Sequence, residues 1–395
     1  MQRRKPAPRG RSWVSVERAI RPASGLGSLG KSFLIIVVFV FIALLPVMGW
    51  GEWRQADVPR KWSFPADHGS HGEYRTEWWY FTGNLSDATG KKYGYQLTFF
   101  RYGLTEQNRD PKNPWSVRDV YLAHFAITDA SNNTFHYTDR ASRKGPGLAG
   151  TDKHKMGVNV LGWSAEMEKN TISLNASFEG MEIKLDLIPV KPPVLHGRSG
   201  LSKKGPLPGQ ASYYYSFTDL ETKGYMKTPG MKDRVAVRGV SWFDQEFGSN
   251  QLAGDQAGWD WFALHLGDGR DLMIYKLRKK DGSVEKESSG TIVEFDGSSR
   301  QISLSDIETT VLAHWKSQKT GGRYPAAWHI RVPSARIDVT VKPLVADQEL
   351  ANTVSAGITY WEGAVDGAGT SNGKNVKVQG YIELTGYSGT IGGTF

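Results

Sequence analysis

The segment Gly239–Gly248, GVSWFDQEFG, places an indole and two carboxyl groups two residues apart. In an extended strand alternate side chains share a face, so Trp242, Asp244 and Glu246 point the same way. Phenylalanines occupy the other face. A strand with large apolar residues on both faces is buried on both, as at a junction between domains. We therefore expect Asp244 and Glu246 to face an apolar cavity near such a junction.

A pair of buried carboxyl groups suits the addition of water to a carbon–carbon double bond. That reaction begins with protonation at carbon, which a carboxylic acid of raised pKa can perform. Aromatic faces stabilise the resulting carbocation, and a second carboxylate accepts a proton from the attacking water. Asp244 and Glu246 are the catalytic candidates. In the structural alternative they bind backbone amides or pair with an arginine such as Arg238.

The segment Gly258–Arg278, GWDWFALHLGDGRDLMIYKLR, reads as the next strands and supplies further polar and aromatic groups. Together with Trp242, its candidates for substrate binding are Trp259, Asp260, Trp261 and His265. The alternative is that the tryptophans fill a β core, which large aromatic residues commonly do. His265 lies between apolar neighbours and equally suits a hydrogen-bonded core histidine.

Other catalytic patterns are weak or absent. His68 and His71, with Glu73 and Glu77 nearby, suggest zinc, but the HExxH pattern is not met, and no metal ligands are assigned. There is no Gly-x-Ser-x-Gly nucleophile motif, P-loop or dinucleotide fingerprint, so we expect no cofactor. The chain contains no cysteine, which excludes disulfides, thiolate metal sites and cysteine nucleophiles.

The elements that must position these residues are strands. From Trp62 onward, short runs of β-branched and aromatic residues alternate with turn signals, such as Asp87–Gly90 and Glu179-Gly180. Roughly fourteen or more antiparallel strands fit two packed barrels of about eight strands each. We predict an all-β fold with domains at residues 60–250 and 251–395. The Pro- and Gly-rich segment Lys191–Gly209 is expected to be a loop within the first.

Charge is concentrated at the N-terminus. The chain of 395 residues carries a net charge of +9, but residues 1–51 hold eight of the basic side chains and one acidic side chain. The remainder has 41 basic and 39 acidic residues, so nothing in its charge favours nucleic acid as a partner. A hydrophobic content of 39% excludes a mostly disordered chain and a polytopic membrane protein.

The basic tail at residues 1–31 precedes an uncharged run at residues 32–50, whose core is FLIIVVFVFIALLPVM. This pattern predicts a signal peptide or an uncleaved membrane anchor with the N-terminus in the cytoplasm. The rest of the chain is then expected on the periplasmic side of the inner membrane, either anchored there or secreted.

Four motifs in this order carry a resemblance: Phe64–Leu85, Gly239–Gly248, Gly258–Arg278, and Tyr360–Val365 with Gly380–Tyr387. They resemble the AttH/carotenoid 1,2-hydratase-like (CrtC-like) family of predicted secreted hydrolases, over about Trp62 to Tyr387. The resemblance implies two tandem lipocalin-like barrels and an apolar, isoprenoid-like or lipid ligand. A Tyr-x-acid pair in the carotenoid-hydratase branch matches Tyr275-Lys276-Leu277, where the tyrosine is kept and the acid is not. On that basis Tyr275 joins the catalytic candidates.

Two functions follow from the resemblance and the residues together. One is a hydratase- or lyase-type enzyme acting on an apolar small molecule. The other is a non-catalytic lipid carrier working with an ABC transporter, which the resemblance implies as a partner. Carboxyl groups aimed into the cavity separate the two, because a carrier needs only apolar walls and a single polar anchor.

Overall fold

The computed structural model describes residues 53–106, 113, 116–250, 253–351, 353 and 358–389. The predicted basic tail and apolar segment at residues 1–50 lie outside these. Within the described residues, no helix has the length and apolar character needed to cross a bilayer. Their only helices are three short 3-10 turns: η1 (Ala66–His68), η2 (Leu304–Asp306) and η3 (Pro333–Ala335).

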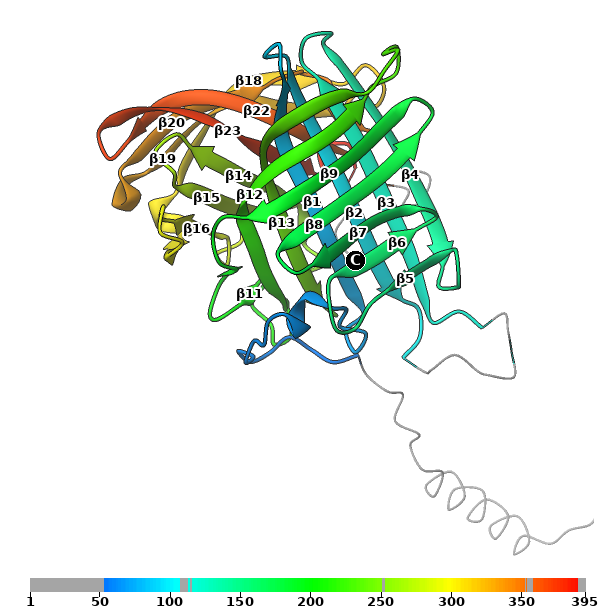
Figure 1. Ribbon diagram of the computed structural model, residues 1–395. Helices are drawn as coiled ribbons and strands as arrows, with labels where there is room; N and C mark the ends of the chain where they lie inside the picture. The colour runs from blue at the N-terminus through cyan, green and yellow to red at the C-terminus, as the bar shows by residue number, and fades with distance from the viewer. Residues whose placement is uncertain are drawn as a thin grey trace, which may run out of the picture. The chain divides into compact units, whose positions relative to one another are not determined.

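The first half of the chain forms a 13-stranded antiparallel sheet (Figure 1). Its strands are β1 (Thr76–Asp87), β2 (Lys92–Gly103), β3 (Asp119–Asp129), β4 (Thr134–Arg143), β5 (Ala149–Thr151), β6 (Gly157–Val160), β7 (Trp163–Glu168), β8 (Thr171–Phe178), β9 (Met181–Pro189), β10 (Val194–Leu195), β11 (Leu201–Lys203), β12 (Ala211–Lys227) and β13 (Val235–Gly248). They are ordered β4-β3-β2-β1-β13-β12-β9-β8-β7-β6-β5, and β10 and β11 both pair with β12. The segment predicted as a loop therefore includes two short strands.

The second half forms a 10-stranded sheet. Its strands are β14 (Gln256–Leu266), β15 (Asp271–Lys279), β16 (Ser289–Val293), β17 (Ser299–Ser303), β18 (Glu308–Lys316), β19 (Arg323–Val332), β20 (Ile337–Pro343), β21 (Glu349–Leu350), β22 (Tyr360–Ser371) and β23 (Lys374–Thr385). The order is β17-β16-β15-β14-β23-β22-β20-β19-β18, with β21 beside β22. The chain changes sheet between β13 and β14. Residues 51–395 form one compact unit, so the predicted domain limits stay a prediction.

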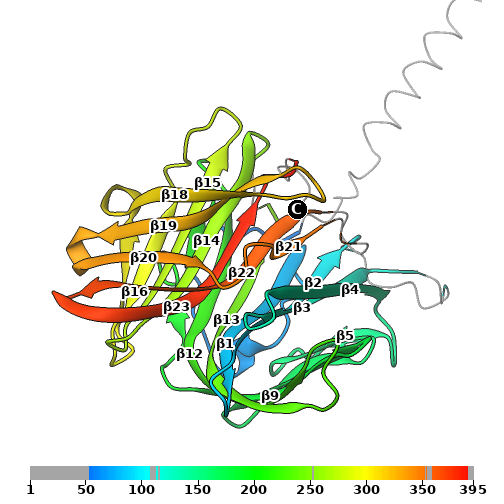
Figure 2. The same ribbon diagram turned by 90° about the horizontal axis from the view of Figure 1, so that it is seen from above.

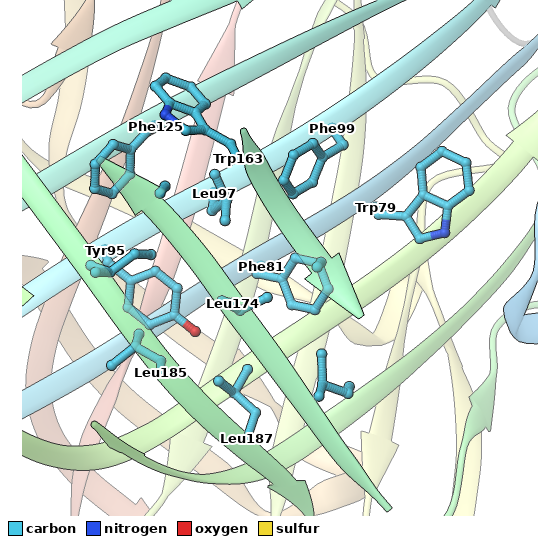
Figure 3. Close-up of a cluster of buried hydrophobic side chains, with 14 of the residues drawn as sticks. Trp79, Phe81, Tyr95, Leu97, Phe99, Phe125, Trp163, Leu174, Leu185 and Leu187 are labelled. Atoms are coloured by element: carbon cyan, nitrogen blue, oxygen red, sulfur yellow. The ribbon is translucent and has the colours of Figure 1, made fainter. Parts of the chain in front are cut away.

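The first sheet curls until β6 contacts β2, β3 and β4, which makes a nearly closed barrel, and the second makes a half-barrel. The all-β fold of two lipocalin-like barrels is thus confirmed, with the second incompletely closed. Figure 3 shows part of the first core, where Trp163 and Leu174 meet Phe81 and Phe125. On β8 and β9 buried and more exposed residues alternate, since one face packs inward and the other meets solvent.

The strands at the junction are buried on both faces, as the phenylalanines around Asp244 predicted. On β13, every residue from Ser241 to Gly248 is buried. Phe243 packs in the first barrel, whereas Trp242 packs in a separate cluster with residues of the second sheet. Across the junction β1 contacts β23 and β2 contacts β22 (Figure 2). One layer of strands therefore serves as barrel wall and junction wall together.

The two sheets lie so close together at Gly94 on β2 that there is no room for a side chain at this position. A Cβ atom built there would lie 2.5 Å from Ala364 Cβ and 2.9 Å from the Tyr381 hydroxyl oxygen. We expect Gly94→Ala to lower the free energy of unfolding by about 1–3 kcal/mol, because neither sheet can yield without repacking. Urea titration measures this. Gly254→Ala, where nothing lies within 4 Å, is the control. Equal midpoints for the two variants would contradict the close contact.

Candidate functional site

A cavity of about 120 Å³ lies between the two sheets. Strands β1, β2, β12 and β13 line one side, and β14, β15, β22 and β23 line the other. Four carboxyl groups reach it, two from β13 and one each from β22 and β23. Three of them, those of Asp244, Glu246 and Glu362, belong to residues at most 5% exposed. This is an unusual density of acids for an apolar enclosure.

Asp244 is held by three hydrogen-bond donors. The Tyr214 hydroxyl donates to Oδ2 at 2.8 Å, and the Trp242 indole donates to Oδ1 at 2.7 Å. The Ser216 hydroxyl also donates to Oδ1 and is in turn contacted by His196. Burial raises the pKa of Asp244 to about 7, although all three donors favour the ionised form. Asp244 therefore exchanges its proton near neutral pH.

Glu246 has a different environment from Asp244, two residues away. Its Oε1 lies 2.9 Å from Lys204 Nζ and accepts a hydrogen bond from Ser212. Burial acts to lower the pKa of Lys204, but the Glu246 carboxylate outweighs it and holds that pKa above its usual value. Glu246 is therefore paired with a cationic side chain, whereas the hydrogen-bond partners of Asp244 are all neutral.

The second sheet contributes Glu362 and Glu383, which face each other as a cross-strand pair of β22 and β23. The Tyr80 hydroxyl donates a hydrogen bond to Glu362, and the Trp259 indole donates one to Glu383 Oε2 at 2.8 Å. Burial and the adjacent Glu383 raise the pKa of Glu362 well above its ordinary value. Burial likewise raises the pKa of Glu383 to about 7. Glu362 is thus the carboxyl best placed to be neutral.

Aromatic side chains form much of the remaining wall. Trp261 meets Tyr80 edge to face, with ring centroids 5.1 Å apart, and its indole donates to the Tyr214 hydroxyl oxygen at 3.1 Å. A chain of contacts therefore runs from Glu362 through Tyr80, Trp261 and Tyr214 to Asp244. Three aromatic side chains thus connect the two acids across the cavity.

Most of the predicted site residues meet at this cavity. Asp244, Glu246, Trp259, Trp261 and Tyr275 line it. The Tyr275 hydroxyl lies 3.1 and 3.0 Å from the backbone carbonyl oxygens of Lys203 and Glu287, which share its one hydrogen. Trp242 contacts Asp244 without lining the cavity.

Two predicted substrate-binding residues do not reach the cavity. Asp260 lies between Trp259 and Trp261 on β14, so the strand period turns it to the opposite face, where it pairs with Arg278 at 2.8 Å. His265 lies on the cavity face but further along the strand, beyond Trp242. It contacts Asp271 at 2.9 Å and borders a separate open groove.

Glu362 and Glu383 were missed as site residues. The motifs YWEGAV and GYIELTGY each contain one glutamate in an apolar strand, which is the available signal. Pairing them requires the register of β22 against β23, and facing them toward Asp244 requires the packing of the two sheets. Neither follows from local spacing.

Of the two histidines before β1, His71 belongs to a buried ion network, and His68 lies 2.7 Å from the Tyr215 hydroxyl oxygen. His71 Nδ1 lies 2.8 Å from Glu77, and its Nε2 lies 3.4 Å from Asp67. Arg101 joins them, with Nε 3.5 Å from Glu77 and Nη1 3.1 Å from Asp119. No group of three potential metal ligands occurs among the described residues. These contacts support a structural role for the network.

The raised pKa of Glu383 predicts a pH-dependent stability. Its ordinary pKa is 4.5 and its folded value is about 7, so its contribution to stability is complete below 4.5 and is lost as pH rises through 7. We expect Glu383→Gln to raise the free energy of unfolding by about 1–2 kcal/mol near pH 8 and to give no gain near pH 4. Urea titrations at both pH values measure this. An equal effect at both would contradict a protonated Glu383.

The fold and the site together define a class of protein. Its members are all-β, with an apolar cavity between two lipocalin-like sheets that is lined by several acids. The chain belongs to the AttH-like family, whose model matches residues 55–387. Its structure is similar to the crystal structure of an AttH candidate from Nitrosomonas europaea, at 33% identity and a TM-score of 0.74, covering 84% of this chain and 98% of that one.

Two further relatives have names that state an activity. Kievitone hydratase from Nectria haematococca shares the fold with a TM-score of 0.63 at 14% identity, covering 86% of this chain and 97% of that one. Dehydratase asqC from Emericella nidulans is 23% identical over 281 residues, which is 68% of this chain and 77% of that protein. Hydratase and dehydratase describe the two directions of one reaction type.

Proposed function

We propose that this protein is a hydro-lyase, which adds water to, or removes it from, an apolar small molecule bound between the two sheets. The observation that carries the proposal is the set of buried carboxyls with unequal proton affinity around one apolar cavity. Such unequal pairs are the usual arrangement for acid–base catalysis. The names of the hydratase and dehydratase relatives support the reaction type.

In the hydration direction, Glu362 donates its proton to one alkene carbon. A C–H bond forms as the π bond breaks, and the adjacent carbon becomes a cation. The faces of Trp78, Trp259 and Trp261 stabilise that charge. Water then bonds to the cation through oxygen, and its surplus proton passes to the Asp244 carboxylate. Transfer of a proton from Asp244 to Glu362 restores the starting state, and the reverse sequence removes water.

The lipid-carrier alternative is less well supported by the cavity. A carrier needs apolar walls and one anchor, whereas four carboxyls line this cavity. Burying acids is costly, and a site that only holds an apolar molecule has no need of them. We also propose that the protein acts outside the cytoplasm. That part of the proposal is supported only by the basic and apolar sequence at residues 1–50.

The reaction type is tested by incubating the full-length protein with isoprenoid alkenes and with β-hydroxy ketones in isotopically labelled water. Addition of labelled water to an alkene, or loss of water from a hydroxy ketone, is the expected result in mass spectrometry. Native mass spectrometry of the purified protein identifies any ligand already bound. A bound apolar molecule that is released unchanged, with no turnover in either panel, would favour the carrier.

A further inference from the structure

The polar groups around the cavity differ in what they offer a ligand, because most of their hydrogen-bond donors are occupied. Tyr80 donates to Glu362, Tyr214 donates to Asp244, and Tyr275 donates to two backbone carbonyls. The Trp261 indole donates to Tyr214. Lys204, the only cationic side chain lining the cavity among the described residues, is paired with Glu246.

Acceptors, by contrast, remain open. Gln96 is 1% exposed and lines the cavity, yet its carbonyl oxygen has no partner within the described structure. Its amide nitrogen donates to the Thr98 hydroxyl oxygen at 2.7 Å. A buried acceptor without a donor costs free energy, so this atom calls for a donor from a ligand or a water molecule.

The balance of charged side chains around the cavity also favours a hydrogen-bond donor as ligand. Four carboxyls line the cavity against one lysine, and that lysine neutralises only Glu246. Asp244, Glu362 and Glu383 accept hydrogen bonds from neutral groups, and no cation of the described chain pairs with them. Buried carboxylates are normally paired with a cation or a metal. Among the described residues no such cation is present, so in the empty cavity burial keeps these carboxyls wholly or partly protonated, and a cationic ligand would supply the partner that their ionised forms lack.

Three tryptophan side chains form part of the cavity wall. Trp78, Trp259 and Trp261 line the cavity beside these acids. The face of an indole carries negative charge density and attracts cations, and proteins that bind quaternary ammonium groups use several such rings together. Open acceptors, unpaired acids and aromatic faces all favour a ligand with positive charge.

We propose that the ligand of this cavity has an apolar body and a cationic nitrogen, either a protonated amine or a quaternary ammonium group. The nitrogen binds beside Glu383 and the Gln96 carbonyl, and the apolar body occupies the aromatic part of the cavity, next to the protonated Glu362. This inference rests on the proposed function for the location of the site, and it adds the chemical class of the substrate.

Binding of a cation must also displace protons. Asp244 and Glu383 have pKa values raised to about 7 by burial, so in the empty cavity they are partly protonated at neutral pH. A cation favours their ionised forms, so its affinity falls as the pH is lowered through 7. A neutral ligand of the same shape shows no such dependence.

The test compares benzyltrimethylammonium, its neutral carbon isostere neopentylbenzene and the anion phenylmethanesulfonate, bound to the full chain in non-ionic detergent. Tryptophan fluorescence reports binding, since three indoles line the cavity. At about pH 8 we expect the ammonium to bind at least tenfold more tightly than the isostere, and the sulfonate not to bind. Near pH 6 the ammonium should lose up to about tenfold per pH unit, while the isostere is unchanged.

Glu383→Gln should weaken ammonium binding several-fold and leave the isostere unaffected, whereas Glu166→Gln, an exposed site on β7, should change neither. Equal affinity of the ammonium and the isostere for the wild-type protein would overturn the inference. Such a result would leave the proposed hydro-lyase activity standing. Conversely, a clear preference for the ammonium with no water added to or removed from any compound would retain the inference and remove the proposed reaction.

Discussion

Glu362→Gln is expected to lower turnover by about 10²–10⁴-fold, the usual effect of losing a general acid. Glutamine keeps the size of the side chain and can still accept the hydrogen bond from Tyr80. It cannot donate a proton of carboxylic acidity, so only the chemical step is removed. Initial rates of labelled-water incorporation into an alkene that the wild-type protein hydrates measure the loss. Affinity for that alkene should change little, because the aromatic wall is intact.

Asp244→Asn is the companion variant, and the pH profile distinguishes the two roles. In the wild-type protein the rate should rise through about pH 7 as Asp244 ionises and fall at higher pH as Glu362 loses its proton. Asp244→Asn should remove the rising limb, and Glu362→Gln the falling limb. The exposed Glu166→Gln serves as the control. Wild-type rates in both variants would exclude these carboxyls from the reaction.

Arg101→Met is expected to lower the free energy of unfolding by about 3–5 kcal/mol, because it leaves buried charges without a partner. Arg101 lies within 3.5 Å of Glu77 and 3.1 Å of Asp119, and it donates to the backbone carbonyls of His71 and Tyr74 at 3.0 and 2.7 Å. Methionine fills similar space but satisfies none of these acceptors. Urea unfolding followed by tryptophan fluorescence measures the change.

The matched control is Arg331→Met. Arg331 also contacts two carboxylates, Glu308 at 2.6 Å and Asp338 at 3.2 Å, but on an exposed part of the second sheet. Solvent screens that pair, so we expect a change within about 1 kcal/mol. If Arg101→Met and Arg331→Met had the same free energy of unfolding, the ion network around Glu77 would not stabilise the start of β1.

What the sequence could predict was local. The two-residue period placed Trp242, Asp244 and Glu246 on one face of β13, and the turn at Glu179-Gly180 is formed with φ of 44° and 87°. The same period, applied to β14, separates Asp260 from the tryptophans beside it. The period alone thus places Asp260 off the face that lines the cavity. His265 lies on the cavity face but further along the strand, which the period does not reveal.

What it could not predict depends on contacts between distant segments. Glu362 and Glu383 become a pair only through the register of β22 with β23. Their position opposite Asp244 depends on how one sheet packs on the other, which involves residues more than 100 positions apart. The separate environments of Asp244 and Glu246 arise from Tyr214 and Lys204, which are contributed by other parts of the chain.

The contact at Gly94 has a consequence for how this family can diversify. Gly94, Ala364 and Tyr381 lie outside the cavity, yet they set how closely the two sheets approach beside it. A bulkier residue at the first two positions would force the sheets to repack, which changes the size of the cavity and also the spacing between Asp244 on one sheet and Glu362 and Glu383 on the other. Ligand size and the spacing of the acids are therefore coupled through a contact that no ligand touches, so a change in one during evolution also changes the other.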